Sequence, residues 1–195
     1  MEFKDYEKYR WFFTSSGKLV VGGKNALQNE QLLRIVRAQR KERLAMHTTE
    51  PGSPFSIILA DMDKLTKNDI EECAIFTASF SKAWKEEKKK ALVDIFKLSQ
   101  LYKLSIMKPG TWGVRNKIER MSVPLELVLT KQENVLRAVP EKSVKLKKDI
   151  LLKISPGKID KTLMLPKFQL SLKIPFSQEE LIVALPAGGV RINKK

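Results

Sequence analysis

The chain has 195 residues, of which 43% are hydrophobic and 30% charged, so it is long enough for a domain with a core and is not a disordered protein. It has no apolar run that could span a bilayer, and with one Cys and one His it can build neither a disulfide framework nor a zinc site of Cys and His ligands. The net charge of +15 favours a polyanionic partner, usually nucleic acid, over a surface that is basic only for solubility.

The cysteine count and the N-terminal sequence bear on localisation. A single cysteine indicates a reducing compartment, and the charged N-terminal stretch lacks the apolar core of a signal peptide. We therefore expect a cytoplasmic protein without a membrane partner.

The first predicted element is a β-hairpin over residues 11–21, with apolar runs on both sides of a Thr-Ser-Ser-Gly turn. Gly22-Gly23 ends its second strand, and Asn25 can cap the helix that follows. A strand–Gly-Gly–helix segment directs backbone N–H groups and a helix dipole at one place, which suits a phosphate, with Lys18 and Lys24 nearby. The alternative is a tight turn that needs glycine and binds nothing.

A first helix is predicted from Asn25 to about Leu44. Its polar face carries Arg34, Arg37 and Lys41 at spacings that make one cationic strip. The strip could follow a phosphate backbone, or it could be an ordinary solvated face.

His47, the only histidine, lies in a segment with two prolines and a glycine, which predicts a stiff loop entering a buried strand at 55–59. Binding residues are often found on such loops, although a single histidine is more often structural. An acid–base pair with Glu50 is conceivable, but the spacing alone does not bring the two together.

A second helix is predicted from Asn68 or Thr66 to about Glu87, with an apolar stripe that faces the core. Residues 91–96 fit either a helical turn or a strand, and residues 104–107 fit a strand. The next segment, 108–117, places Trp112 among basic residues. An exposed Trp there could stack on a base while the cations hold phosphate, or it could be buried and close a turn.

The C-terminal part begins with a predicted hairpin of residues 123–129 and 135–139, followed by a Lys-rich linker at 140–148. Strands are expected at 150–154 and 170–174, and the Ser177–Glu180 spacing predicts a capping box at the start of a short helix. The sequence has no Walker loop, nucleophile elbow or Gly-x-Gly-x-x-Gly motif, and the two acids of Asp-Met-Asp at 61–63 are weak evidence for a metal site. We therefore expect no catalytic activity, cofactor or bound metal.

Four of these segments together resemble the NFACT-R domain, the RNA-binding domain of NFACT proteins, which act in ribosome-associated quality control. They are Arg-Trp-Phe-x-Thr-Ser-x-Gly-x-Leu-x-x-Gly-Gly-Lys at 10–24 with Ala26 and Asn-Glu at 29–30, His47 with Gly-Ser at 52–53, Ser81 with Ala-Trp at 83–84, and Gly-Thr-Trp-x-Val-Arg-Asn-Lys at 110–117. Asn25 stands where the family more often has Asp, and Thr-Thr at 48–49 replaces Ala-Asp.

The resemblance covers roughly residues 6–140, and the C-terminal part is similar to the tail of short standalone members. We expect none of the N-terminal, helix-hairpin-helix and coiled-coil parts of large NFACT proteins, so tRNA recruitment and tailing of stalled chains are not carried over.

The sequence thus predicts an α+β fold, in which two main helices pack on a mixed, largely antiparallel sheet. It divides the chain into an RNA-binding domain at 1–140 and a small C-terminal extension at 141–195. The predicted function is non-catalytic binding of tRNA or ribosomal RNA, and the alternative is a protein-interaction module that docks on a ribosome or a quality-control partner. The predicted RNA-binding residues are Arg10, Lys18, Gly22, Gly23, Lys24, Asn25, Arg34, Arg37, Lys41, His47, Lys108, Trp112, Arg115 and Lys117.

Overall fold

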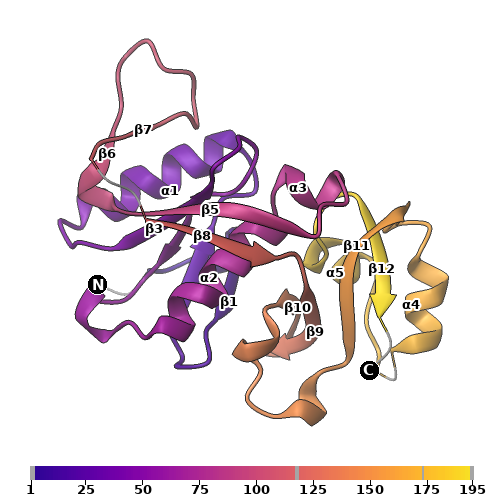
Figure 1. Ribbon diagram of the computed structural model, residues 1–195. Helices are drawn as coiled ribbons and strands as arrows, with labels where there is room; N and C mark the ends of the chain where they lie inside the picture. The colour runs from indigo at the N-terminus through magenta and orange to yellow at the C-terminus, as the bar shows by residue number, and fades with distance from the viewer. Residues whose placement is uncertain (1–2, 117–118, 173, 194–195) are drawn as a thin grey trace.

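The computed structural model describes residues 3–116, 119–172 and 174–193. It is an α+β fold with antiparallel sheets, as the sequence predicts (Figure 1). Within these residues no helix combines the length and apolar character that crossing a membrane requires. Short 3-10 turns lie at Tyr6–Lys8, Met62–Lys64, Leu98–Gln100, Glu141–Ser143 and Lys147–Asp149.

Among the described residues, the first sheet has six strands in the order β1-β2-β4-β3-β5-β8, and neighbouring strands are antiparallel. The hairpin at its edge is the one predicted, with Trp11 opposite Val21. The strands are β1 Arg10–Phe13, β2 Leu19–Gly22, β3 Leu44–Thr48, β4 Ser56–Ile58, β5 Lys90–Lys97 and β8 Glu119–Pro124.

This sheet is buried on both faces. Trp11 and Val21 belong to the cluster that contains the apolar side of α1 (Ala26–Ala38). Their neighbours Phe12 and Val20 belong to a second cluster, which contains α2 (Lys67–Ser79) and α3 (Lys82–Lys85). Because alternate residues of β1 and β2 meet different helices, these two strands read as continuous apolar runs rather than as an alternating pattern.

Both predicted helices are shorter than expected. α1 ends at Ala38, Arg40 takes a positive φ of 53°, and Leu44 begins β3 instead of ending a helix. The prediction of Lys41 as a helical residue was therefore wrong, and the strip of three cations is broken. In the second segment Thr66 caps α2 as predicted, but the helix stops at Ser79. The Ser81 hydroxyl then caps α3 by accepting from the Ala83 amide, 3.1 Å away.

The ambiguous residues 91–96 lie in β5, and the strand predicted at 104–107 is wrong. β6 (Leu101–Tyr102) pairs instead with β7 (Gly113–Val114), and residues 103–112 form a projecting loop that we call the arm (Figure 1). Ile106 is 87% exposed, so the apolar residues that suggested a strand have no sheet to pack against.

The described residues of the C-terminal part form a four-stranded sheet in the order β10-β9-β11-β12, covered by α4 (Leu165–Ser171) and α5 (Gln178–Ala184). The capping box of α5 is confirmed. The strand predicted at 170–174 is wrong, because 165–171 are helical and residue 173 lies outside the described residues. The strands are β9 Leu127–Gln132, β10 Val135–Val139, β11 Leu152–Asp160 and β12 Gly189–Asn193.

The predicted hairpin of this part is β9–β10. Its turn is Glu133-Asn134, both with positive φ, while 123–124 belong to β8 of the first sheet. Strands from both sides of residue 140 share the second sheet, and the division at 140 stays a prediction.

The two sheets meet at the β1 edge. The Gln132 side chain accepts from the Phe13 amide at 2.8 Å and donates to the Phe13 carbonyl at 2.9 Å. The Arg137 guanidinium lies 4.1 Å from the centre of the Trp11 ring. An edge strand presents unpaired backbone groups, and here a side chain from the second sheet pairs them. This contact places β10 beside the start of β1, where the predicted site lies.

Candidate nucleic-acid interface

A pocket of about 540 Å³ lies where the β2–α1 turn, the loop after β3, the end of α2 and the arm meet. Its lining comes from segments spread between residues 10 and 114. The fold therefore brings together predicted site residues that are far apart in the sequence. Those in the lining are Arg10, Gly23, Lys24, Asn25, His47 and Trp112.

The floor of the pocket is the start of α1. The Asn25 side chain accepts from the Gln28 amide at 2.9 Å, so the predicted N-cap is confirmed. A Cβ at Gly23 would lie 2.6 Å from the Asn29 amide nitrogen, which no side chain tolerates. Asn29 in turn accepts from the Phe55 amide at 3.1 Å. Close packing between the turn and α1 is thus sufficient reason for glycine at 23.

Two cations lie at the wall formed by the β2–α1 turn. The Arg10 guanidinium donates to the Gly23 carbonyl at 3.1 Å and lies 5.2 Å from the centre of the Phe80 ring. In the described part of the chain, neither Arg10 nor Lys24 forms an ion pair. Burial lowers the pKa of Arg10, and burial followed by repulsion from Arg137 and Arg10 lowers the pKa of Lys24. A bound anion would relieve this repulsion.

Two further cations come from the C-terminal part, and neither is among the predicted site residues. Arg137 on β10 has its pKa lowered to about 10, mainly by burial. Lys161 donates to the carbonyls of Ile182 and Leu185 at the end of α5, and its pKa is lowered by burial and then by Arg10. They lie more than 120 residues from Arg10 in the chain, and no local pattern marks them as part of the same positive region.

His47 lies in β3 opposite Asp94, not in the loop where the sequence placed it. Its ring packs on Phe55 with 4.6 Å between the ring centres, and Nδ1 lies 2.7 Å from the Thr48 carbonyl oxygen. Nδ1 therefore carries the proton, and Nε2 is an acceptor. Burial lowers the pKa of His47, while the Thr48 carbonyl and Asp94 oppose this shift, so the ring is neutral at pH 7.

The loop after β3 is held by internal hydrogen bonds, and its predicted stiffness stays a prediction. The Ser53 hydroxyl accepts from the Thr48 amide at 2.9 Å, and the Thr48 hydroxyl donates to the Glu50 carbonyl at 2.6 Å. The Glu50 carboxylate pairs with Lys88 at 2.6 Å rather than with His47. The acid–base pair considered from the sequence is therefore not formed.

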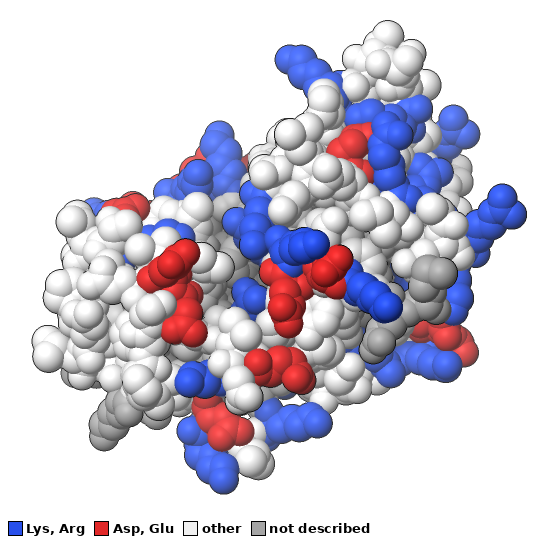
Figure 2. All heavy atoms as spheres, turned by 180° about the vertical axis from the view of Figure 1, so that it is seen from behind, with Lys and Arg blue, Asp and Glu red and all other residues white. Residues whose placement is uncertain are grey.

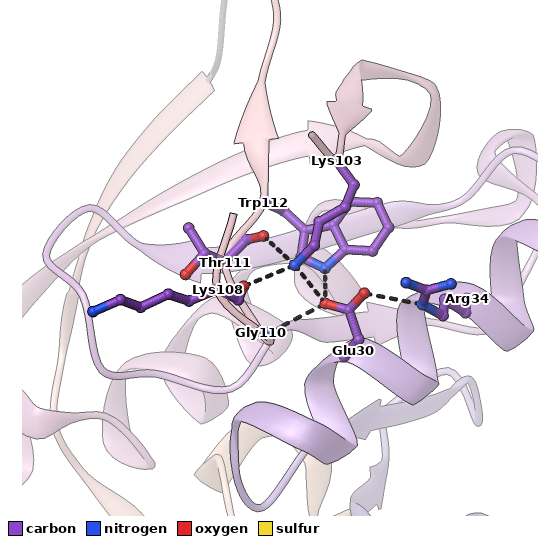
Figure 3. A network of polar contacts seen from close by, with 7 residues as sticks. All are labelled: Glu30, Arg34, Lys103, Lys108, Gly110, Thr111 and Trp112. Carbon is purple, nitrogen blue, oxygen red and sulfur yellow. Dashed lines mark hydrogen bonds and ion pairs between the residues drawn. The ribbon is translucent and has the colours of Figure 1, made fainter. Parts of the chain in front are cut away.

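The arm is attached to α1 by the Glu30 carboxylate (Figure 3). Glu30 accepts from the Trp112 indole at 3.1 Å, from Lys103 at 2.9 Å and from the Gly110 amide at 3.1 Å. Burial alone would raise the pKa of Glu30, but hydrogen bonds from Lys103, Gly110 and Arg34 bring it below its ordinary value. Lys103 also donates to the carbonyls of residues 108 and 111. The network fixes where Trp112 lies at the pocket.

Trp112 combines features of both alternatives left open by the sequence. It is half-buried and holds the arm by its N–H, yet its ring lines the pocket. Arg37 lies 5.2 Å and Lys103 5.6 Å from the ring centre. Arg37 thus reaches the edge of the site through Trp112.

The remaining predicted residues that the structure describes are not in the lining of the pocket. Lys18 lies at the opposite end of β2 from Gly22, beside the residue that pairs with Phe13. Arg34 pairs with Glu30 at 2.9 Å, and Arg115 lies 4.9 Å from the centre of the Tyr102 ring. Gly22 lies in β2, Lys41 follows α1, Lys108 lies on the arm, and Lys117 is outside the described residues.

Figure 2 shows the charge on the face opposite to the view of Figure 1. Lys and Arg gather beneath the projecting arm and run to the middle of the molecule, with acids interspersed. Much of the C-terminal part on this face is neither basic nor acidic.

Comparison with known families fits this site. Residues 8–116 match the family model of the NFACT protein RNA binding domain. The chain belongs to this family. The match includes every described residue that lines the pocket, whereas Arg137 and Lys161 of the positive region lie outside it.

One curated relative is the archaeal Rqc2 homolog aRqcH of Methanocaldococcus jannaschii, 29% identical over 210 aligned residues. The alignment covers 100% of this chain and 30% of the relative. Among solved structures, the C-terminal part of the fibronectin/fibrinogen-binding protein of Streptococcus suis has a TM-score of 0.53 and 22% identity. That match covers 64% of this chain and 48% of the other, and at this identity it shows a shared fold.

Proposed function

We propose that this protein binds RNA through the pocket and the positive region around it, without catalysing a reaction. The observation that supports this most directly is the position of Arg10 and Lys24. Both line the pocket, Arg10 lies over the Phe80 ring, and neither forms an ion pair within the described residues. Unpaired cations beside aromatic faces suit a phosphate backbone with accessible bases.

The proposed target is tRNA or ribosomal RNA, and the proposed setting is translation or ribosome-associated quality control in the cytoplasm. Support comes from membership of an RNA-binding domain family and from the relative described as an Rqc2 homolog. Because the chain spans 30% of that relative, the proposal covers RNA binding and not the whole activity of the larger protein.

The proposal of binding without catalysis rests on the surroundings of His47. Its Nδ1 is engaged by a backbone carbonyl, and the nearest carboxylate, Asp94, is held by Arg120 at 2.7 Å and Thr49 at 2.8 Å. Within the part of the chain that the structure describes, no three His, Cys, Asp or Glu residues are grouped as a metal site would require.

Lys24 and Lys18 provide a matched test, because they lie at opposite ends of β2 and only Lys24 lines the pocket. Binding of labelled tRNA, a ribosomal RNA fragment and duplex DNA would be followed by fluorescence anisotropy at several salt concentrations. We expect the affinity to fall steeply with salt, and Lys24→Glu to reduce the slope of log K against log salt by about 1. Lys18→Glu should change this slope less than Lys24→Glu does. Salt-independent binding, or equal effects of both variants, would contradict the proposal.

A second candidate is docking on a protein, and exposed apolar side chains of the C-terminal part favour it. Leu163 is 74% exposed and Leu170 is 89% exposed, both around α4. Co-sedimentation with ribosomes would be compared for the wild type, Leu163→Ser with Leu170→Ser, and Lys24→Glu. If only the double Leu variant no longer co-sediments, the protein docks through its apolar surface. If only Lys24→Glu no longer co-sediments, the protein binds ribosomal RNA.

A further inference from the structure

We propose that the pocket takes one unstacked base of the bound RNA, with the neighbouring phosphate on Arg10 and Lys24. This inference rests on the proposed RNA binding and makes it more specific. It assigns the pocket to a single nucleotide taken from an unpaired region, rather than to the backbone of a double helix.

Aromatic side chains line the pocket. The His47 ring packs on the buried Phe55 ring at 4.6 Å between centres, with the planes tilted by 35°, and the partly exposed Phe80 and Trp112 also line the pocket. A site for phosphate alone needs cations and backbone N–H groups, not ring faces. Bases bind proteins by stacking on aromatic side chains, and the pocket volume of about 540 Å³ falls in the usual range for small ligands.

His47 also supplies a hydrogen-bond acceptor. Its Nδ1 proton is used by the Thr48 carbonyl, so Nε2 is left as the acceptor, and His47 is among the residues that line the pocket. Burial keeps this ring neutral, as its lowered pKa indicates. Nucleobases carry N–H donors on their pairing edges, which are accessible only when the base is unpaired. A neutral acceptor on the ring that packs against Phe55 therefore complements a base better than it complements a phosphate.

Cations and an aromatic ring occur together in the lining of the pocket. Arg10 lies over Phe80 and is fixed by the Gly23 carbonyl, and Lys24 is the next residue of the same turn. Phosphate and base are joined through one ribose, so a nucleotide places an anion and a flat apolar ring a few bonds apart. The pocket offers cations for the phosphate and aromatic rings for the base within one cavity.

The loop after β3 and the arm, which form two walls of the pocket, are held by hydrogen bonds without a ligand. Hydrogen bonds from Ser53 and Thr48 hold the loop after β3, and Glu30 holds the arm on the other side. When a pocket is already formed, binding of a base costs little conformational entropy of the protein.

The test compares two RNA strands of equal length and charge, one normal and single-stranded, the other without bases. For the wild type we expect the base-free strand to bind about tenfold more weakly. His47→Ala should weaken the normal strand to a similar level and leave the base-free strand unchanged. His47→Phe should restore much of the difference in affinity between the normal and the base-free strand, since it keeps an aromatic ring at this position. Lys24→Glu should weaken both strands. Circular dichroism and thermal melting would check that each variant is folded.

Each outcome separates this inference from the proposed function. If the wild type binds both strands equally and with salt dependence, the base pocket is wrong and RNA binding through phosphate stands. If His47→Ala weakens both strands alike, the effect is structural and the base pocket is again wrong. If neither strand binds but tRNA or the ribosomal RNA fragment does, the base pocket is wrong and RNA binding stands. If none of these RNAs binds, the proposed function fails and the inference fails with it.

Discussion

The indole N–H of Trp112 donates to the Glu30 carboxylate at 3.1 Å, and this bond joins two segments 82 residues apart. The same carboxylate oxygen accepts from Lys103, so one side chain of α1 holds both sides of the arm. The pocket wall formed by the arm therefore depends on a residue that does not itself line the pocket.

Replacement of Glu30 should loosen the arm. The side chains of Glu30 and Lys103 are 12% and 18% exposed, so Glu30→Gln leaves Lys103 without its partner in a largely buried place. We expect the free energy of unfolding in urea to fall by about 2 kcal/mol. Proteolytic cleavage within residues 103–112 should become faster. The matched control is Glu179→Gln, an exposed acid near the start of α5. Equal behaviour of the two variants would contradict this role for Glu30.

Gly23→Ala should be more damaging than Gly17→Ala. At Gly23 a Cβ would lie 2.6 Å from the Asn29 amide nitrogen, so α1 must move. At Gly17 φ is +80° and no atom lies within 4 Å of the Cβ position, so only backbone strain of about 1–2 kcal/mol is expected. Urea unfolding of both variants measures the difference. A smaller loss for Gly23→Ala would mean that the turn does not pack on α1 in this way.

Gln132 should hold the second sheet against the first. It forms two hydrogen bonds with the backbone of Phe13, one as acceptor and one as donor. Gln132→Ala removes both and should cost about 1–3 kcal/mol in the free energy of unfolding. Gln132→Glu keeps the acceptor for the Phe13 amide but sets a charged acceptor against the Phe13 carbonyl, so it should not restore the stability of the wild type. Hydrogen exchange of the Phe13 amide should quicken in Gln132→Ala, and unchanged exchange would show that this edge is protected by other contacts.

His47 should make stability depend on pH. Its pKa in the folded protein is below the value of about 6.5 expected in the unfolded chain, because burial disfavours the charged ring. As pH falls through about 6.5, the unfolded chain binds a proton that the folded protein does not. The free energy of unfolding therefore decreases from pH 7.5 to pH 5.5.

His47→Phe should remove this part of the pH dependence, since His47 is the only histidine in the chain. Burial raises the pKa of Glu72, which by itself stabilises the folded state as pH falls, so the comparison must be between the two proteins at each pH. Identical pH profiles of wild type and His47→Phe would rule out a depressed His47 pKa.

The local elements follow largely from the sequence. Apolar runs on both sides of Thr-Ser-Ser-Gly specify the β1–β2 hairpin, and Asn25, Thr66 and Ser177 cap the helices that they were expected to cap. These features are decided by neighbouring residues, through backbone hydrogen bonds and turn geometry.

The errors occur where long-range contacts outweigh local preference. Leu44 continues a helical pattern but pairs with Lys97 in the sheet, and residues 165–171 are helical although the 170–174 segment looks like a strand. Sheet pairing with a distant strand and packing on a core are not visible in a window of a few residues.

The family, the α+β class and the basic character follow from the sequence alone, as do six of the residues that line the pocket. Only the tertiary structure showed that His47 is a neutral strand residue and that Glu30 holds Trp112. It also brought Arg137 on β10 near Lys24, and Lys161, just after β11, near Arg10. The physical reason is that charge and local propensity are properties of single residues and their neighbours. Burial, pKa and the meeting of cations depend on how distant segments pack.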